Sequence, residues 1–188
     1  MKHAQPAAGF TRRQTLLQLG AAWAASAWPH SAQATPVPDA LLLNRDGQPA
    51  RLRSDVWRDR VALVNFVFTS CSSFCGVQSA MIGALQTRLA PRLGRDLVLI
   101  SITLDPLSDD PKRLAEFSKP FEPGPHWWWL TGEARQVFRV LDSLGADRGA
   151  PSDHSPFLLV GQPHSLKRLV GFPSMAQLEA AILKEMRT

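Results

Sequence analysis

The chain contains two cysteines, Cys71 and Cys75, whose type and spacing point to chemistry. They follow the apolar run Val61–Phe68, which is typical of a strand buried on both faces. Both thiols are therefore expected in a loop between a strand and a helix. Sulfur is a soft metal ligand and a two-electron redox centre. Because the two cysteines are four positions apart (i, i+4), both sulfurs lie on one side of a turn and can converge on a single ion.

Three interpretations of this pair follow from the residues alone: a structural bridge, a redox-active dithiol and a metal site. A disulfide across so short a loop would constrain the chain little, which argues against the first. Cys75 is expected near the start of the following helix, where the partial positive charge of the helix terminus favours a thiolate.

Two more side chains are predicted to reach the same edge of the sheet. Asp105 follows the apolar run 97–104, which should be parallel to 61–68, and His154 precedes strand 157–160, which should be antiparallel. Two thiolates and one imidazole suit Cu(I), whereas zinc would need a fourth ligand or a water. Asp105, otherwise a turn residue before proline, is a candidate for orienting His154 or attracting a cation.

The rest of the chain reads as an α/β domain with alternating strands and helices. An Asp-Gly turn predicts an N-terminal β-hairpin, and Asp110 followed by Pro111 predicts a helix start. Asp109 is interpreted with Asp110 as helix capping. The expected elements are hairpin arms 41–43 and 51–52, strands 61–68, 97–104, 127–130, 157–160 and 166–170, and helices 76–89, 111–119, 133–144 and 175–186.

Residues 1–34 have the layout of an export signal, with basic residues, a short apolar stretch and small residues before the expected cleavage point. The pair Arg12-Arg13 fits a signal of the twin-arginine type. The apolar stretch is shorter than the ~20 residues that span a bilayer, and an uncleaved membrane anchor is the alternative.

Cleavage would leave residues 35–188 as one domain. The net charge of the whole chain is +5, but the leader holds three basic residues and no acidic ones, so the domain carries +2. With so small a charge and no basic run, nucleic acid is not an expected partner.

Four segments resemble the SCO/SenC family of copper-binding, thioredoxin-like proteins, in order and in spacing. The resemblance covers residues 39–187. Ser72 and Gly76 depart from it, since that family often has proline after each cysteine. The segments are the CxxxC loop Thr69–Cys75, the strand and helix start in Ile100–Pro106 and Asp109–Pro111, the strand end Leu130–Gly132, and the ligand-histidine segment Asp153–Ser155.

The resemblance implies a thioredoxin-like fold, a mixed central sheet flanked by helices, and copper ligands Cys71, Cys75 and His154. It implies Cu(I) as the preferred state, with Cu(II) as a second one. The implied protein is a monomeric periplasmic metallochaperone that delivers copper to, or matures, a cytochrome c oxidase copper centre. Its partner would be a membrane-proximal oxidase subunit or another copper protein.

The alternative function is that of a thiol–disulfide reductase, which keeps a partner's metal-binding cysteines reduced. It would use the same two thiols without His154. Whether the protein is an enzyme depends on which of the two functions holds.

Overall fold

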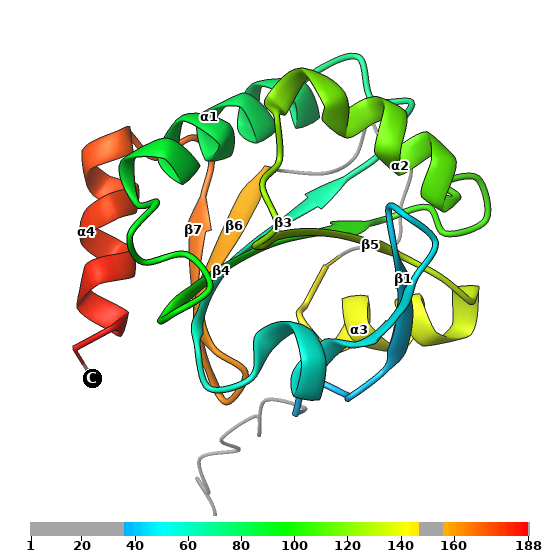
Figure 1. Cartoon of the computed structure of the whole chain (residues 1–188), viewed down its shortest axis with the longest axis horizontal. Helices are drawn as coiled ribbons and strands as arrows, with labels where there is room; N and C mark the ends of the chain where they lie inside the picture. Colours follow the sequence, from blue (N-terminus) through cyan, green and yellow to red (C-terminus); the bar gives the residue numbers. More distant parts are fainter. Residues whose placement is uncertain (1–35, 147–155, 188) are drawn as a thin grey trace, which may run out of the picture. The chain divides into compact units, whose positions relative to one another are not determined.

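A computed structural model describes residues 36–146 and 156–187. These residues form a seven-stranded sheet in the order β2-β1-β5-β4-β3-β6-β7, flanked by helices (Figure 1). The α/β prediction and most predicted elements are confirmed. The strands are β1 Leu41–Asn44, β2 Pro49–Arg51, β3 Val61–Val67, β4 Leu97–Thr103, β5 Trp127–Thr131, β6 Phe157–Gln162 and β7 Ser165–Val170, and the α-helices are α1 Cys75–Arg88, α2 Pro111–Ser118, α3 Ala134–Ser143 and α4 Met175–Glu185.

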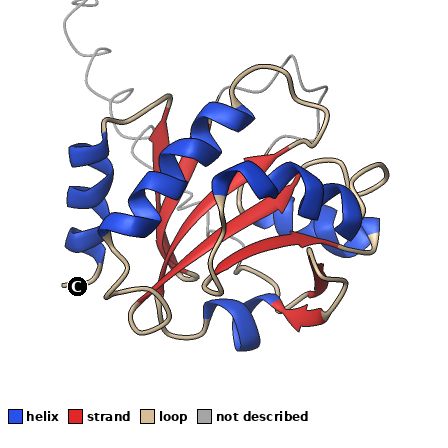
Figure 2. Ribbon diagram, turned by 45° about the horizontal axis from the view of Figure 1, so that its top comes forward, coloured by secondary structure: helices blue, strands red, loops and turns tan. Residues whose placement is uncertain are grey.

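The sheet is mixed, as predicted. β3, β4 and β5 run parallel, and β6 pairs antiparallel with β3, with Leu63 opposite Val160. The carboxyl ends of β3 and β4 and the start of β6 therefore lie at one edge, which we call the carboxyl edge of the sheet. Figure 2 shows the strands crossing the centre of the domain between the helices.

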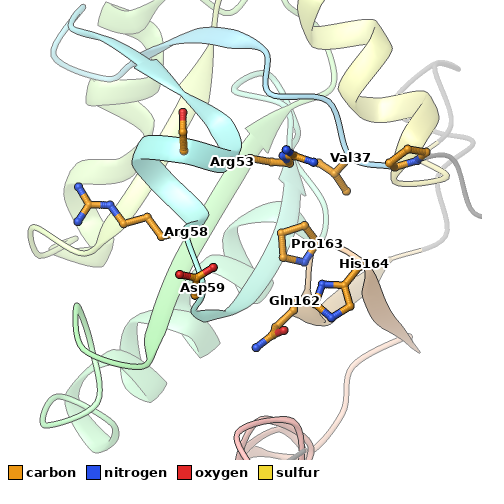
Figure 3. Close-up of a pocket in the computed structure, with 9 residues that line it drawn as sticks. Val37, Arg53, Arg58, Asp59, Gln162, Pro163 and His164 are labelled. Atoms are coloured by element: carbon orange, nitrogen blue, oxygen red, sulfur yellow. The ribbon is translucent and has the colours of Figure 1, made fainter.

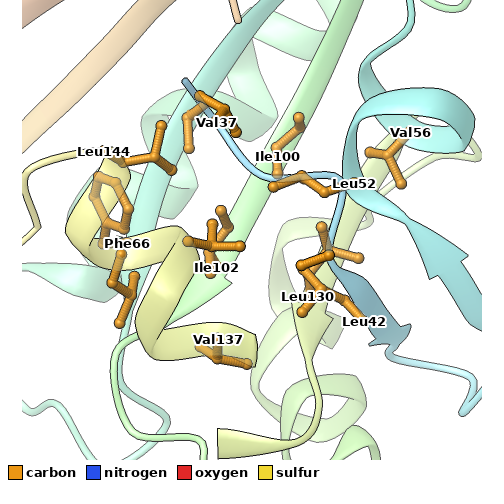
Figure 4. Packing of buried hydrophobic residues seen from close by; sticks show 14 of the residues in the cluster. Val37, Leu42, Leu52, Val56, Phe66, Ile100, Ile102, Leu130, Val137 and Leu144 are labelled. Carbon is orange, nitrogen blue, oxygen red and sulfur yellow. The ribbon is translucent and has the colours of Figure 1, made fainter. Parts of the chain in front are cut away.

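β3 and β4 lie in the middle of the sheet, where both faces are covered, and every residue in both strands is buried. Alternate side chains enter opposite layers of core. Ala62, Val64 and Phe66 pack on the α3 side, whereas Leu63 and Val67 pack toward α1, α2 and α4. Figure 1 shows α3 on the face of the sheet opposite α1 and α2, and Figure 4 shows the α3 side of the core.

The N-terminal hairpin is confirmed, although its second strand ends earlier than predicted. The side-chain oxygen of Asn44 accepts hydrogen bonds from the amides of Asp46 and Gln48, and Gly47 takes the positive φ that the turn requires. Leu52, expected in the hairpin, instead begins a helical segment, η1 (Leu52–Trp57).

The N-terminus of η1 is held by a residue far away in the sequence. The carboxylate of Asp39 accepts hydrogen bonds from the amides of Arg53 and Ser54, at 2.8 and 3.0 Å. Because this cap comes from 14 residues upstream, local sequence patterns do not predict η1. A short 3-10 helix, η2 (Lys119–Phe121), also extends α2 beyond its predicted end.

No helix of the described segments is long and apolar enough to cross a membrane. The predicted export signal, residues 1–34, lies outside the described residues, and the division of the chain at residue 34 stays a prediction.

Candidate metal and redox site

The cysteine loop leaves β3 at the carboxyl edge of the sheet. The amide of Cys71 donates to the carbonyl of Phe68 at 3.2 Å and closes a turn. Helix α1 begins at Cys75 itself, and the expected strand–loop–helix setting is confirmed. Cys71 is half-buried, whereas Cys75 is only 1% exposed. An incoming reagent or metal therefore meets Cys71 first.

Both cysteines are free thiols, and they lie close enough for each to shift the pKa of the other. The sulfur of Cys71 also lies 3.3 Å from the hydroxyl of Ser73. The loop therefore brings the two sulfurs within range of each other, as their spacing predicts. A soft ion could bind both thiolates there, and loss of two electrons could join them as a disulfide.

The two thiols differ sharply in acidity. Partial burial opposes ionisation of Cys71, but hydrogen bonds from the Ser73 hydroxyl, the Cys75 thiol and the amides of both residues outweigh it. Together these contacts lower the pKa of Cys71 to about 7. Cys71 is therefore substantially a thiolate at neutral pH.

The expectation that the helix terminus favours a Cys75 thiolate is wrong. Burial, aided by the neighbouring Cys71 and by the negative charge of Asp109, raises the pKa of Cys75 to about 12. Desolvation acts on the whole charge of a thiolate, whereas the helix terminus offers about half a unit of opposite charge. Whatever removes the Cys75 proton must therefore supply strong stabilisation, as metal coordination does.

The third predicted ligand, His154, lies outside the described residues, so its role stays a prediction. β6 begins beside the end of β3, as the prediction required, which brings the chain shortly after residue 154 to the carboxyl edge. Residues 36–146 and 156–187 contain no group of three or more His, Cys, Asp or Glu side chains that could hold a metal.

Asp105 lies where predicted, in the turn after β4. Its amide donates to the hydroxyl of Thr103 at 3.0 Å, and its carbonyl accepts the amide of Asp109 at 2.8 Å. Both contacts are those of a turn residue. A role beside His154 is left as a prediction.

Asp109 is a residue of this site that sequence reasoning missed. Asp110 caps α2 as predicted, accepting from the amide of Arg113 at 2.7 Å, but Asp109 is only 2% exposed and takes no part in the cap. Its carboxylate instead binds Thr69 and Thr103, which follow or end β3 and β4. The sequence offered one signal for this role, namely a threonine at or just after the end of each strand. The hydroxyl of each of these threonines needs a hydrogen-bond acceptor when it is buried.

A cavity of about 570 Å³ lies at the other end of the strands (Figure 3). Gly161, one residue before the turn that lines this cavity, pairs with Ala62 at the start of β3, whereas the cysteines follow its end. The cavity is thus separate from the thiol pair. Its lining residues are Pro36, Val37, Arg53, Ser54, Arg58, Asp59, Gln162, Pro163 and His164.

The sequence matches the family model described as SCO1/SenC over residues 33–168. It is 33% identical over 93 residues to a protein named "SCO1 protein homolog" from Bacillus subtilis, a match that covers 47% of this chain and 45% of that protein. The chain spans about half the length of the curated relatives that it matches.

Solved structures share the fold. BsSco, described as a member of the Sco family of cytochrome c oxidase assembly proteins with a disulfide switch, superposes with a TM-score of 0.67 at 24% identity. That match covers 81% of this chain and 94% of BsSco. Copper-bound ScoI from Arabidopsis thaliana gives a TM-score of 0.64 at 22% identity, over 82% of this chain and 98% of ScoI. The predicted thioredoxin-like fold is confirmed.

Proposed function

Because the chain belongs to the SCO1/SenC family, we propose that it is a periplasmic copper metallochaperone that delivers copper to, or matures, a copper centre of cytochrome c oxidase. The observation that carries the proposal is the pair of free thiols in one loop at the carboxyl edge, close enough for each to shift the pKa of the other. Copper bound to Arabidopsis ScoI supports the choice of metal.

The proposed ligands are the two thiolates of Cys71 and Cys75 and the imidazole of His154. Sulfur and imidazole donors select Cu(I), and three ligands leave one side of the ion open. A partner's ligand could enter there and displace the chaperone's ligands one after another. Exposure of Cys71 makes its sulfur the accessible member of the pair.

Redox state and copper load are coupled in this proposal. The reduced pair binds copper as two thiolates, so binding releases the protons that the thiols still hold. Loss of two protons and two electrons converts the pair to a disulfide, which no longer offers thiolates to copper. An oxidant would therefore release copper or prevent its binding.

The cellular location in this proposal rests on residues 1–34, whose composition is that of an export signal. We infer a monomer that works beside the membrane, with an oxidase subunit or another copper protein as acceptor. A fusion of residues 1–34 to a reporter that is active only outside the cytoplasm tests the location. An inactive fusion would contradict it.

A copper titration of the reduced protein tests the metal assignment. We expect one Cu(I) per chain, measured by competition with a chromophoric chelator. Cys71→Ser and Cys75→Ser should each lose tight binding. Ser72→Ala is the matched control, because Ser72 is exposed in the same loop. Tight binding that survives either cysteine substitution would overturn the ligand assignment.

The unequal acidity of the thiols favours a second candidate function, that of a thiol–disulfide reductase. A Cys71 thiolate would attack a partner's disulfide and form a mixed disulfide, releasing one partner thiolate. Cys75 would then attack Cys71 sulfur, lose its proton and free the second partner thiol. Loss of copper binding with retained thiol exchange in His154→Ala would separate the two functions.

A further inference from the structure

Asp109 is a buried carboxylate at the carboxyl edge of the sheet. It is 2% exposed, and no lysine or arginine among the described residues forms an ion pair with it. Glu185, the other buried carboxylate of the described segments, instead pairs with Lys167. A buried carboxylate is costly unless hydrogen bonds compensate for the lost water, so Asp109 must obtain its stabilisation from its hydrogen-bond partners.

The hydrogen bonds of Asp109 connect three parallel strands. Its carboxylate accepts the amide of Thr69 at 3.2 Å, the hydroxyl of Thr69, and the hydroxyl of Thr103 at 2.7 Å. Its backbone carbonyl accepts the hydroxyl of Thr131 at 2.6 Å. Thr69 follows β3, while Thr103 and Thr131 are the last residues of β4 and β5. One residue thus holds three neighbouring strand ends at a fixed separation.

Thr69 is the link between this cluster and the thiols. It lies inside the turn that the hydrogen bond from the Cys71 amide to the Phe68 carbonyl closes. Two bonds from Thr69 to one carboxylate fix both its backbone and its side chain. A change in the backbone torsion angles of Thr69 would move the Cys71 sulfur relative to Cys75, which is buried at the start of α1.

We propose that Asp109, acting through Thr69, is a positioning residue for the thiol pair and sets how closely the two sulfurs converge. A role limited to fold stability would make Thr103→Val at least as harmful as Thr69→Val, because the Thr103 hydroxyl donates to Asp109 and also accepts the Asp105 amide. The positioning role treats them differently, because only Thr69 belongs to the cysteine loop. The part of this inference that concerns copper rests on the proposed function.

The test compares Thr69→Val with Thr103→Val in the full chain, each lacking one hydroxyl bond to Asp109. Urea unfolding should show a loss of stability in both. Thr69→Val should weaken Cu(I) binding about tenfold, as substitutions behind metal ligands do, and Thr103→Val less than about threefold. Thr69→Ser, which keeps the hydroxyl, should restore binding. Equal loss of affinity in both valine variants, or none in Thr69→Val, would overturn the proposal.

A metal-free measurement separates this inference from the copper proposal. In a glutathione buffer, the two thiols lose two protons and two electrons to glutathione disulfide, which becomes two glutathione molecules. The equilibrium constant for this exchange should change about tenfold in Thr69→Val and little in Thr103→Val. If the parent protein bound no copper, the proposed copper function would be wrong. The equilibrium constants of Thr69→Val and Thr103→Val would still decide whether Asp109 positions the thiols. Thr69→Ala carries the same test if Thr69→Val does not fold.

Discussion

Replacement of Ser73 by alanine should change how the reactivity of Cys71 depends on pH. The Ser73 hydroxyl lies 3.3 Å from the Cys71 sulfur and helps lower the pKa of this thiol to about 7. A hydrogen bond to a charged group is worth about 1.5–3 kcal/mol, and the partly solvated sulfur places it at the low end. Because one pKa unit is about 1.4 kcal/mol, we expect the pKa to rise to about 8.

Two effects then oppose each other. At pH 7 the thiolate fraction of Cys71 falls from about a half to about a tenth, whereas the remaining thiolate becomes about threefold more nucleophilic. Alkylation by iodoacetamide should therefore slow about twofold at pH 7. At pH 10, where both forms are ionised, the variant should react about threefold faster. The rates cross between these two pH values.

The assay is the rate of alkylation of the reduced, metal-free protein between pH 6 and 10, with mass spectrometry to locate the label. Cys75 should stay unlabelled, because it is 1% exposed and its pKa is raised to about 12. Ser72→Ala is the matched control and should follow the parent profile. A parent midpoint near the ordinary value of about 8.5, or label first on Cys75, would refute the reasoning.

Three further results are expected. In chelator competition, the apparent Cu(I) affinity should rise about tenfold per pH unit between pH 7.5 and 10. The reason is that Cys71 is already ionised, so that binding must remove only the Cys75 proton. An affinity that does not change with pH would contradict a protonated Cys75. Gly161→Ala should lower the free energy of unfolding, measured in urea, by at least about 2 kcal/mol. A Cβ at this position would lie 2.1 Å from the Ser165 carbonyl oxygen, and the backbone φ is +140°. Unchanged stability would exclude this close approach. Ser174→Ala should cost about 1 kcal/mol by breaking the capping box of α4, and thermal unfolding that does not change would argue against that cap.

The sequence predicted those parts of the fold that depend on local physics. The central strand β3 was predictable because each of its residues is buried. Both of its faces are covered, so it appears in the sequence as a continuous apolar run and not as an alternation of apolar and polar residues. The Asn44–Gly47 turn and the Asp110 cap use side chains that bond to amides two to four residues away. Such bonds belong to the local chain and leave a pattern in it.

Features that depend on distant partners were not predictable from the sequence. The helical segment η1 receives its cap from Asp39, and the role of Asp109 depends on threonines that three separate strands bring together. The acidity of Cys75 depends on the packing of α1 against the sheet, which removes water from a thiol that the helix terminus alone would have made more acidic. The placement of both thiols was predicted correctly, but their electrostatics required the packed structure.

The most direct test of the central claim is X-ray absorption at the copper edge of the Cu(I)-loaded protein. We expect two sulfur ligands and one nitrogen ligand, loss of one sulfur in Cys71→Ser or Cys75→Ser, and loss of the nitrogen in His154→Ala. A nitrogen ligand that persists in His154→Ala, or a copper site without two sulfurs, would contradict it.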